Sequence, residues 1–272
     1  MDTRNTKIEF QSNRRRSASQ RRACYDANLH GDAGIFRVTD AAQIREGILR
    51  VQGRMNAAAR KAGRNPGDVT LIGVTKTQPV EAIRIAFEAG VRHFGENRVQ
   101  EWEGKRAALG DLQATWHLIG HLQSNKAARA AGLFHSVDSV DAVALAQRLA
   151  RAREGAGKLR ILLEVRVAEE ESKSGVKVEE AAKLVEEIAE LSHLELAGLM
   201  CIPPFLEDVE QVRPYFRRLR ELRDSLAGQT GQQLPVLSMG MSHDFEVAIE
   251  EGATEVRVGT ALFGQRAAAE TP

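Results

Sequence analysis

The stretch LIGVTKTQP (71–79) is a short apolar, β-branched run that stops at a lysine. Seven further short apolar runs follow along the chain, and helical patterns separate them. The predicted strands are 69–76, 92–97, 115–121, 133–139, 159–168, 196–203, 235–242 and 255–264. The predicted helices include 39–63, 79–90, 140–155, 178–192 and 209–228.

This alternation of strands and helices predicts an α/β protein with a parallel sheet. Eight such units in one domain favour a single closed (β/α)8 TIM barrel. An open doubly wound sheet is the alternative, and it is weakened because no G-x-G-x-x-G fingerprint follows any predicted strand. We predict a barrel over 39–266, followed by a short C-terminal tail over 267–272.

The composition is that of a globular protein with a full core. The chain has 272 residues, of which 43% are hydrophobic and 28% charged, and its net charge is +1. This balance gives no electrostatic reason to expect nucleic-acid binding by the barrel. Two cysteines, Cys24 and Cys201, exclude a disulfide framework and favour a cytoplasmic protein. No apolar run has the roughly 20 residues of a membrane-spanning helix.

The first 38 residues differ from the rest of the chain. The segment NRRRSASQRRACYDANLHGDAG (13–34) is rich in Arg, Ser and Gly and has no apolar period. An arginine cluster of this kind is compatible with RNA contact or with a targeting segment. Its composition favours a disordered N-terminal extension over 1–38 with no fold of its own.

Lys76 ends the first predicted strand. Enzymes with this barrel build their sites at the C-terminal ends of the strands. Because side chains alternate along a strand, Ile72, Val74 and Lys76 share one face, so a valine that points into the barrel places the lysine at its mouth. A lysine amine in that position is able to form a Schiff base with an aldehyde.

The end of the seventh strand has the features of a phosphate site. LSMGMSHDFEVAI (237–249) closes a strand with Gly240, Met241 and Ser242, and a helix is expected to open at about Asp244. A hydroxyl beside small residues at a helix N-terminus favours an anion, because backbone N–H groups are free there.

The eighth strand, VRVGTALFG (256–264), adds Arg257, Gly259 and Thr260. Barrel phosphate sites recur in the loops after strands seven and eight. Arg257 shares a face with Gly259 and is expected to point inward beneath the phosphate. An anion site here and a lysine on strand one suit a ligand with both an aldehyde and a phosphate, such as pyridoxal 5′-phosphate.

Other predicted strand ends carry polar groups as well. Asn97 ends the second strand, and His117 and His121 are predicted on the third. No third ligand follows the two histidines at suitable spacing, so we predict no metal site.

With these motifs the chain resembles the pyridoxal phosphate homeostasis proteins, a family whose fold is that of the N-terminal barrel of alanine racemase. The resemblance runs from about residue 40 to Arg266 and rests on GVTKTQP, FGENRVQE, WHLIGHLQSNK, ESKSGV, GLMCIP, LSMGMSHDFEVAI and VRVGTALFGQR. The family pattern usually has an aromatic residue after GEN, where this chain has Arg98.

The resemblance implies a role for each candidate residue. Lys76 would be the Schiff-base lysine, and Asn97 would lie beside the cofactor. Arg257 would face the pyridine nitrogen. Ser242, with the backbone of Gly259 and Thr260 and the neighbouring Met241, would bind the phosphate.

Three functions remain open: a pyridoxal phosphate carrier or buffer, an amino-acid racemase, and a lysine-dependent aldolase. Racemisation needs a second acid–base group opposite the lysine, and relatives that racemise use a tyrosine from a C-terminal domain. The chain ends six residues after Arg266, and its two tyrosines, Tyr25 and Tyr215, lie in the tail and in a predicted helix. A carrier without efficient turnover is therefore favoured. The expected partners are the cofactor and recipient apo-enzymes, in a monomer or weak homodimer, and Lys173 is a candidate relay for the departing cofactor.

Overall fold

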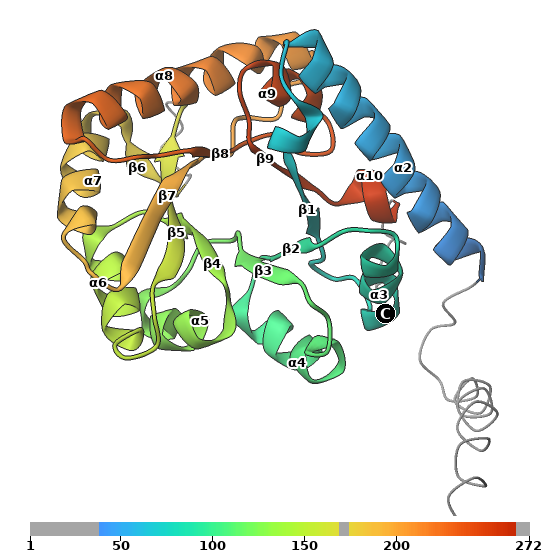
Figure 1. Ribbon diagram of the computed structural model, residues 1–272, viewed down its shortest axis with the longest axis horizontal. Coiled ribbons are helices and arrows are strands. Elements are labelled where there is room, and N and C mark those ends of the chain that lie inside the picture. The colour runs from blue at the N-terminus through green and yellow to red at the C-terminus, as the bar shows by residue number, and fades with distance from the viewer. Residues whose placement is uncertain (1–37, 169–173, 265–272) are drawn as a thin grey trace, which may run out of the picture. The chain divides into compact units, whose positions relative to one another are not determined.

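The computed structural model describes residues 38–168 and 174–264. Eight parallel strands close into a barrel, in the order β4-β3-β2-β1-β9-β8-β7-β5 with β5 paired to β4, and helices surround them (Figure 1). The strands are β1 (Thr70–Val74), β2 (His93–Glu96), β3 (Thr115–Leu118), β4 (Ser136–Val140), β5 (Leu159–Arg166), β6 (Val176–Lys177), β7 (Leu194–Met200), β8 (Val236–Ser238) and β9 (Glu255–Val258). The predicted barrel is confirmed, and the two-residue β6, which was not predicted, pairs with β5 outside the closed ring.

The α-helices alternate with the barrel strands as predicted. They are α2 (Val38–Lys61), α3 (Val80–Glu88), α4 (Val99–Leu109), α5 (Ala127–Leu133), α6 (Val143–Ala152), α7 (Ala181–Ala189), α8 (Arg213–Thr230), α9 (Phe245–Glu250) and α10 (Thr260–Phe263). Short 3₁₀ turns are η1 (Pro66–Asp68), η2 (Ser124–Lys126), η3 (Val178–Glu180) and η4 (Val209–Gln211). None of the helices within the described residues is both long and apolar enough to cross a membrane.

Several predicted boundaries were wrong, because polar residues at the strand ends belong to turns. The strand predicted over 255–264 ends at Val258, and its second half is the helix α10. The helix predicted over 209–228 starts as the turn η4, and α8 begins at Arg213. Pro214 then lies in the first turn of α8, where its missing N–H costs nothing.

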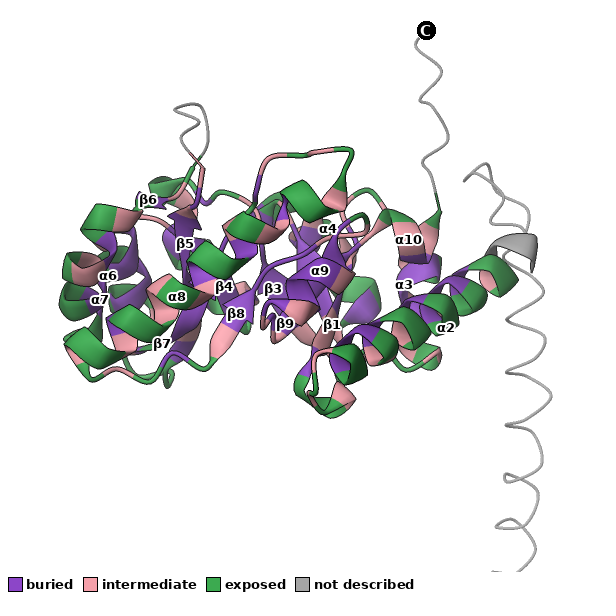
Figure 2. Cartoon of the chain, turned by 90° about the horizontal axis from the view of Figure 1, so that it is seen from above, coloured by how far each residue is buried: buried purple, intermediate pink, exposed green. Residues whose placement is uncertain are grey.

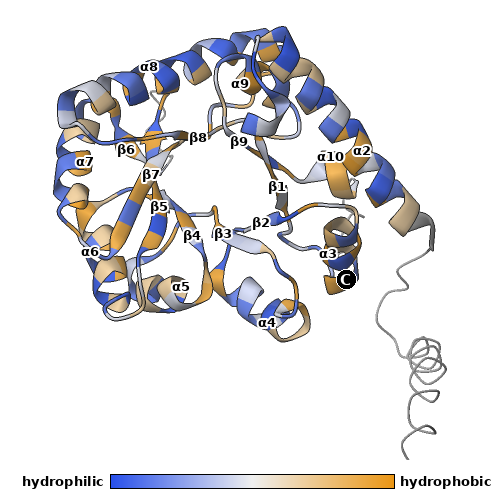
Figure 3. Ribbon diagram, in the orientation of Figure 1, coloured by the Kyte–Doolittle hydropathy of each residue, from blue (hydrophilic) through white to orange (hydrophobic). Residues whose placement is uncertain are grey.

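The long helix α2 covers the wall of the barrel beside the short α10. It packs against α3, α9 and α10, as Figure 1 shows. Gly47 permits this approach, because a Cβ there would lie 2.6 Å from the carbonyl oxygen of Leu262. The strands and the inner sides of the helices are buried (Figure 2), while the outer surfaces of α2 and α8 are mostly hydrophilic (Figure 3).

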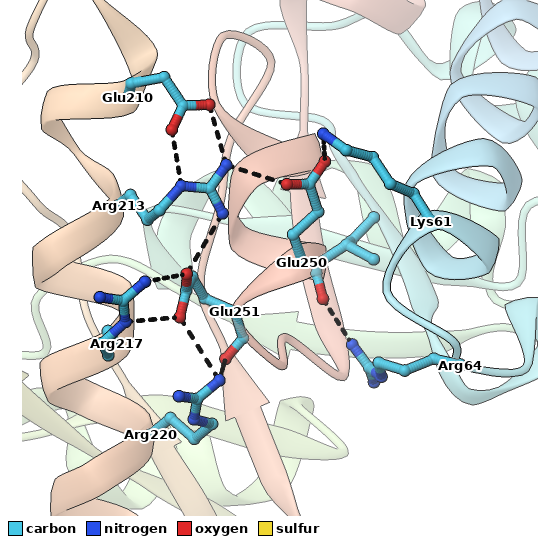
Figure 4. Close-up of polar contacts among 9 residues, drawn as sticks. Lys61, Arg64, Glu210, Arg213, Arg217, Arg220, Glu250 and Glu251 are labelled. Carbon is cyan, nitrogen blue, oxygen red and sulfur yellow. Dashed lines mark hydrogen bonds and ion pairs between the residues drawn. The ribbon is translucent and has the colours of Figure 1, made fainter.

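An ion-pair network joins the helices α8, α9 and α2 (Figure 4). The buried carboxylate of Glu251 accepts hydrogen bonds from Arg213 and Arg217, at 3.2 and 2.9 Å for the closest contact of each. Arg213 also donates to Glu250, which in turn accepts from Lys61 of α2. The network therefore fixes α2 and α8 on either side of the short helix α9, which follows the predicted phosphate turn.

Candidate functional site

Lys76 lies two residues beyond the end of β1 and is half-buried. The strand was predicted to reach it, but the chain turns directly afterwards, and Thr77 adopts a left-handed conformation with φ 63°. Ile72, on the same face, is fully buried and would contact a Cβ placed on Gly95 of the neighbouring β2. This face of β1 therefore points into the barrel, and Lys76 follows in the turn at the mouth, two residues after Val74.

The backbone on both sides of Lys76 is held by helix α4. The N–H of Thr77 donates to the Glu101 carboxylate. Lys105 Nζ donates to the carbonyl oxygen of Thr75 and to Glu101 Oε1, each over 2.8 Å. A positive-φ threonine is strained, and these bonds keep the turn that presents Lys76 in one conformation.

Glu96, the last residue of β2, completes this support and was missed in the sequence. Its side chain is fully buried, and Oε1 accepts from Thr75 Oγ1 at 2.7 Å and from Lys105 Nζ at 2.9 Å. Burial raises the pKa of Glu96, and the bonds from Lys105 and Thr75 act in the opposite direction. The acid that ends the strand HFGE (93–96), directly after Phe94 and Gly95, was the available signal for a buried pair.

Arg257 is buried inside the barrel at 3% exposure, as predicted from its alternation with Gly259. Its two terminal nitrogens donate to Ser238 Oγ and to the carbonyl oxygen of Cys201, each over 2.8 Å. Arg257 pairs in register with Ile72 of β1, two steps of alternation before Lys76. Burial raises the pKa of the Cys201 thiol to about 12, so this cysteine is an inert core residue.

Ser242 joins the turn after β8 to the start of α10. Its Oγ accepts the N–H of Gly259 at 3.2 Å and that of Ala261 at 3.3 Å. Gly259 and Thr260, predicted on the last strand, instead cap and open α10, and Thr260 is exposed. Since Ser242 already engages the N–H of Gly259, its hydroxyl proton is left to donate outward.

The turn that carries Ser242 depends on its neighbours. Asp244 caps it, with Oδ1 accepting the N–H of Met241 at 2.6 Å. Gly240 has φ +94°, and a Cβ there would lie 2.6 Å from the Cβ of Ala248. Side chains larger than hydrogen are therefore excluded at Gly240, and α9 packs directly under the turn.

The structure brings the lysine and the predicted phosphate turn to adjacent strands. Because the barrel is closed, β9 pairs with β1. A Cβ on Gly259 would lie 3.4 Å from the Cβ of Val74, which precedes Lys76 by one alternation. Lys76, Gly259 and Ser242 thus belong to one corner of the barrel mouth.

Asn97 directly follows β2 and is half-buried. The β3 loop packs on it closely, since a Cβ on Gly120 would lie 2.4 Å from the Asn97 carbonyl oxygen. The register of β1 with β2 pairs Val74 with Gly95, so Asn97 is the strand-end neighbour of Lys76. Lys173 lies outside the described residues.

The two histidines predicted on the third strand lie apart. His121 is past the end of β3, exposed, and 3.4 Å from Asp141. His117 is buried inside the barrel, with Nδ1 3.0 Å from Asp138 Oδ2 and Nε2 3.1 Å from His93 Nδ1. The two histidines were predicted to share one face of the strand, but β3 ends at Leu118, so His121 does not belong to that face.

A buried polar cluster surrounds His117 at the N-terminal end of the barrel. A ring nitrogen of His117 and carboxylate oxygens of Asp138 and Glu255, atoms that are able to bind a metal ion, lie within 4.8 Å of one another. Arg160 donates to Glu255 Oε1 at 2.6 Å and lies 3.7 Å from Asp138 Oδ1. The guanidinium supplies the positive charge that a metal ion would bring, so we interpret the cluster as structural.

The sequence matches known proteins over most of its length. The profile of the family "Alanine racemase, N-terminal domain" matches residues 50–267. A pyridoxal phosphate homeostasis protein of Aquifex aeolicus is 49% identical over 222 residues, covering 81% of this chain and 97% of that relative. A pyridoxal phosphate homeostasis protein of Pseudomonas aeruginosa is 47% identical over 224 residues, covering 82% of this chain and 96% of that relative.

Solved structures give the same result. The structure of PipY from Synechococcus elongatus with PLP bound is 39% identical, with a TM-score of 0.73. The match covers 81% of this chain and all of the PipY chain. An alanine racemase of Clostridium difficile 630 is 14% identical with a TM-score of 0.66, and this chain covers 59% of it, which shows the shared fold alone. The chain belongs to the pyridoxal phosphate homeostasis proteins, on the alanine racemase N-terminal fold.

Proposed function

We propose that this chain binds pyridoxal 5′-phosphate covalently through Lys76 and serves as a cytoplasmic carrier or buffer of that cofactor, without efficient turnover. The observation that carries the proposal is that Val74, two residues before Lys76, packs against Gly259, whose N–H the Ser242 hydroxyl accepts. A relative that is 39% identical has been solved with PLP bound.

The residues present fit the cofactor. The cofactor supplies an electrophilic aldehyde and an electron-accepting ring. The Lys76 amine binds the aldehyde as a Schiff base, at a turn held by α4. The hydroxyl of Ser242 and the N–H of Thr260 donate to the phosphate. The Ser242 oxygen at the same time accepts the hydrogen bonds from the N–H groups of Gly259 and Ala261.

Arg257 faces the pyridine nitrogen from inside the barrel. Its hydrogen bonds to Ser238 and Cys201 fix the guanidinium and leave further N–H groups to donate. A guanidinium keeps its proton at physiological pH, so it holds the ring nitrogen unprotonated and the ring a poor electron sink. Carbanion chemistry is thereby disfavoured, in keeping with a carrier.

Racemisation in relatives uses a tyrosine that the described barrel mouth does not supply. It requires an acid–base group on the face of the substrate opposite the lysine. Tyr215 is the one tyrosine that the described part of the chain contains, and it belongs to α8, outside the barrel. The racemase alternative is therefore not favoured.

Recipient apo-enzymes complete the proposal, since a carrier must release its ligand. Lys173 remains proposed as a transient acceptor for the cofactor leaving Lys76. The test is the rate at which loaded protein activates an apo-enzyme. Wild-type rates in Lys173→Ala would remove Lys173 from the proposal and leave the carrier function intact.

The absorbance spectrum of the protein with pyridoxal phosphate tests the main proposal. We expect a band at about 420 nm that is absent from Lys76→Ala, and borohydride should fix the cofactor on Lys76. Adding L-alanine should give no racemisation. A missing band would overturn the cofactor site, and measurable D-alanine would replace the carrier by an enzyme.

A further inference from the structure

A cavity opens at the barrel mouth between the turn that follows β2 and the loop that follows β3. Its volume is about 460 Å³, within the range of small-molecule sites. Asn97 lines it, whereas Lys76, Ser242 and Arg257 do not. The cavity therefore adjoins the proposed cofactor site, and the two share Asn97.

The floor of this cavity is apolar. Val99, Leu118 and Leu122 line it and are 2%, 1% and 3% exposed. They come from α4, β3 and the loop after β3, so the floor is part of the packed barrel and keeps its shape without a ligand. Each of these side chains exposes only an edge, so the base of the cavity is apolar and preformed.

The rim is cationic. Arg98 is exposed and Lys126 half-buried, and both line the cavity. Neither side chain has a hydrogen bond or ion pair to any residue within the described ranges, and none of the lining residues is acidic. Two cations that form no ion pair with a described residue, beside an apolar floor, favour a ligand that is part anion and part ring.

The nearby acids do not neutralise this rim. Asp141 pairs with His121, the third basic residue of the cavity, at 3.4 Å. Glu101 accepts from Lys105 and from Thr77. Burial would raise the pKa of Glu101, but these bonds, with a smaller effect from the charge of Arg98, lower it. Arg98 and Lys126 thus remain available to an external anion.

We infer that this cavity is a noncovalent binding site for a phosphorylated aromatic small molecule. The ring lies on Val99, Leu118 and Leu122, and the phosphate is held between Arg98 and Lys126. Arginine presents a planar fork of donors that matches two phosphate oxygens, and lysine adds a point charge. Arg98 is also the residue at which this chain departs from the aromatic that the family pattern has after GEN, so the inference concerns this chain's own residues.

Phenyl phosphate is the probe, because it has the ring and the phosphate but no aldehyde to react with Lys76. Calorimetric titration of the full chain without pyridoxal phosphate should show two sites, one at the proposed phosphate turn and one at this cavity. Arg98→Gln and Lys126→Gln should each weaken the cavity site about tenfold, the effect of losing one charge-assisted bond. Arg151→Gln, an exposed arginine of α6 outside the cavity, is the matched control and should bind as the wild type does.

Three further measurements locate the ligand and define its class. Ser242→Ala should weaken only the site at the phosphate turn and leave the cavity site unchanged; a single site that Ser242→Ala weakens and Arg98→Gln does not would place the probe in the cofactor's phosphate turn alone and overturn the inference. Inorganic phosphate binding as tightly as phenyl phosphate would show that charge alone is recognised and would refute the ring site. Benzoate should bind more weakly than phenyl phosphate, and equal affinity would refute the preference for phosphate. None of these outcomes depends on the Schiff base, so a failure of this inference would leave the proposed carrier function untouched.

Discussion

The guanidinium of Arg257 and the carbonyl oxygen of Cys201 lie 2.8 Å apart inside the barrel, on β9 and directly after β7. The same guanidinium reaches Ser238 of β8, between them. One buried side chain thus ties the ends of three neighbouring strands together. Its position beneath the barrel mouth means that structural support and the proposed contact with the ring nitrogen depend on the same residue.

Arg257→Gln should lower the free energy of unfolding by about 2–3 kcal/mol, because Ser238 Oγ and the Cys201 carbonyl oxygen lose a charged donor in a buried site. Arg257→Lys keeps the charge but not the fork, and should lose less. Urea denaturation measures both. Arg151→Gln at the surface should stay within about 0.5 kcal/mol of the wild type. A wild-type midpoint for Arg257→Gln would show that the two bonds contribute nothing.

Gly240→Ala should destabilise the protein by about 3 kcal/mol, because its backbone has φ +94° and the new methyl would collide with Ala248. The phosphate turn should shift as well, and pyridoxal phosphate should bind more weakly. Gly228→Ala is the control of opposite sign. Gly228 lies within α8 with open space around it, so alanine should stabilise the helix by about 0.5–1 kcal/mol. Equal effects at both positions would contradict the packing argument.

Periodicity alone located all eight barrel strands, because parallel strands buried on both faces appear as apolar runs between helical patterns. It extended several of them too far: Lys76 and Gly259 lie in the turns beyond β1 and β9. A turn residue of moderate hydropathy resembles a strand residue until the left-handed φ of Thr77 is known. The sequence therefore predicts which residues meet at the mouth better than it predicts where strands end.

Contacts between distant side chains were beyond prediction. Lys105 looks like any solvated helix lysine, and only the fold reveals that it reaches Glu96 and Thr75 behind Lys76. Likewise, the cavity under Arg98 forms only when the turn after β2 meets the loop after β3. Pairings of this kind depend on how two loops approach, which local patterns do not encode.

Lys105→Met should cost about 3 kcal/mol at pH 7, because it leaves the Glu96 carboxylate buried without its cation. Burial raises the pKa of Glu96 already, and losing Lys105 should raise it further. The folded variant then holds Glu96 protonated, so the loss should be small below the unfolded pKa of about 4.5 and should grow as the pH rises. Adding Glu96→Gln to Lys105→Met should recover part of the stability. A double variant as unstable as the single one at every pH would contradict this account.

His93 should make the protein less stable in mild acid. Burial lowers the pKa of His93 to about 4, and the neighbouring charges of His117 and Arg160 act in the same direction. Because an unfolded histidine has a pKa of about 6.5, the unfolded chain binds a proton between these two values that the folded chain refuses. The stability that neutral His93 contributes is therefore present above about pH 6.5 and is lost as the pH falls towards about 4. Denaturation midpoints measured across this range should decline for the wild type and decline less for His93→Gln. The same substitution at His193, which directly precedes β7, should keep the wild-type slope, and identical slopes for all three proteins would show that another group controls the acid response.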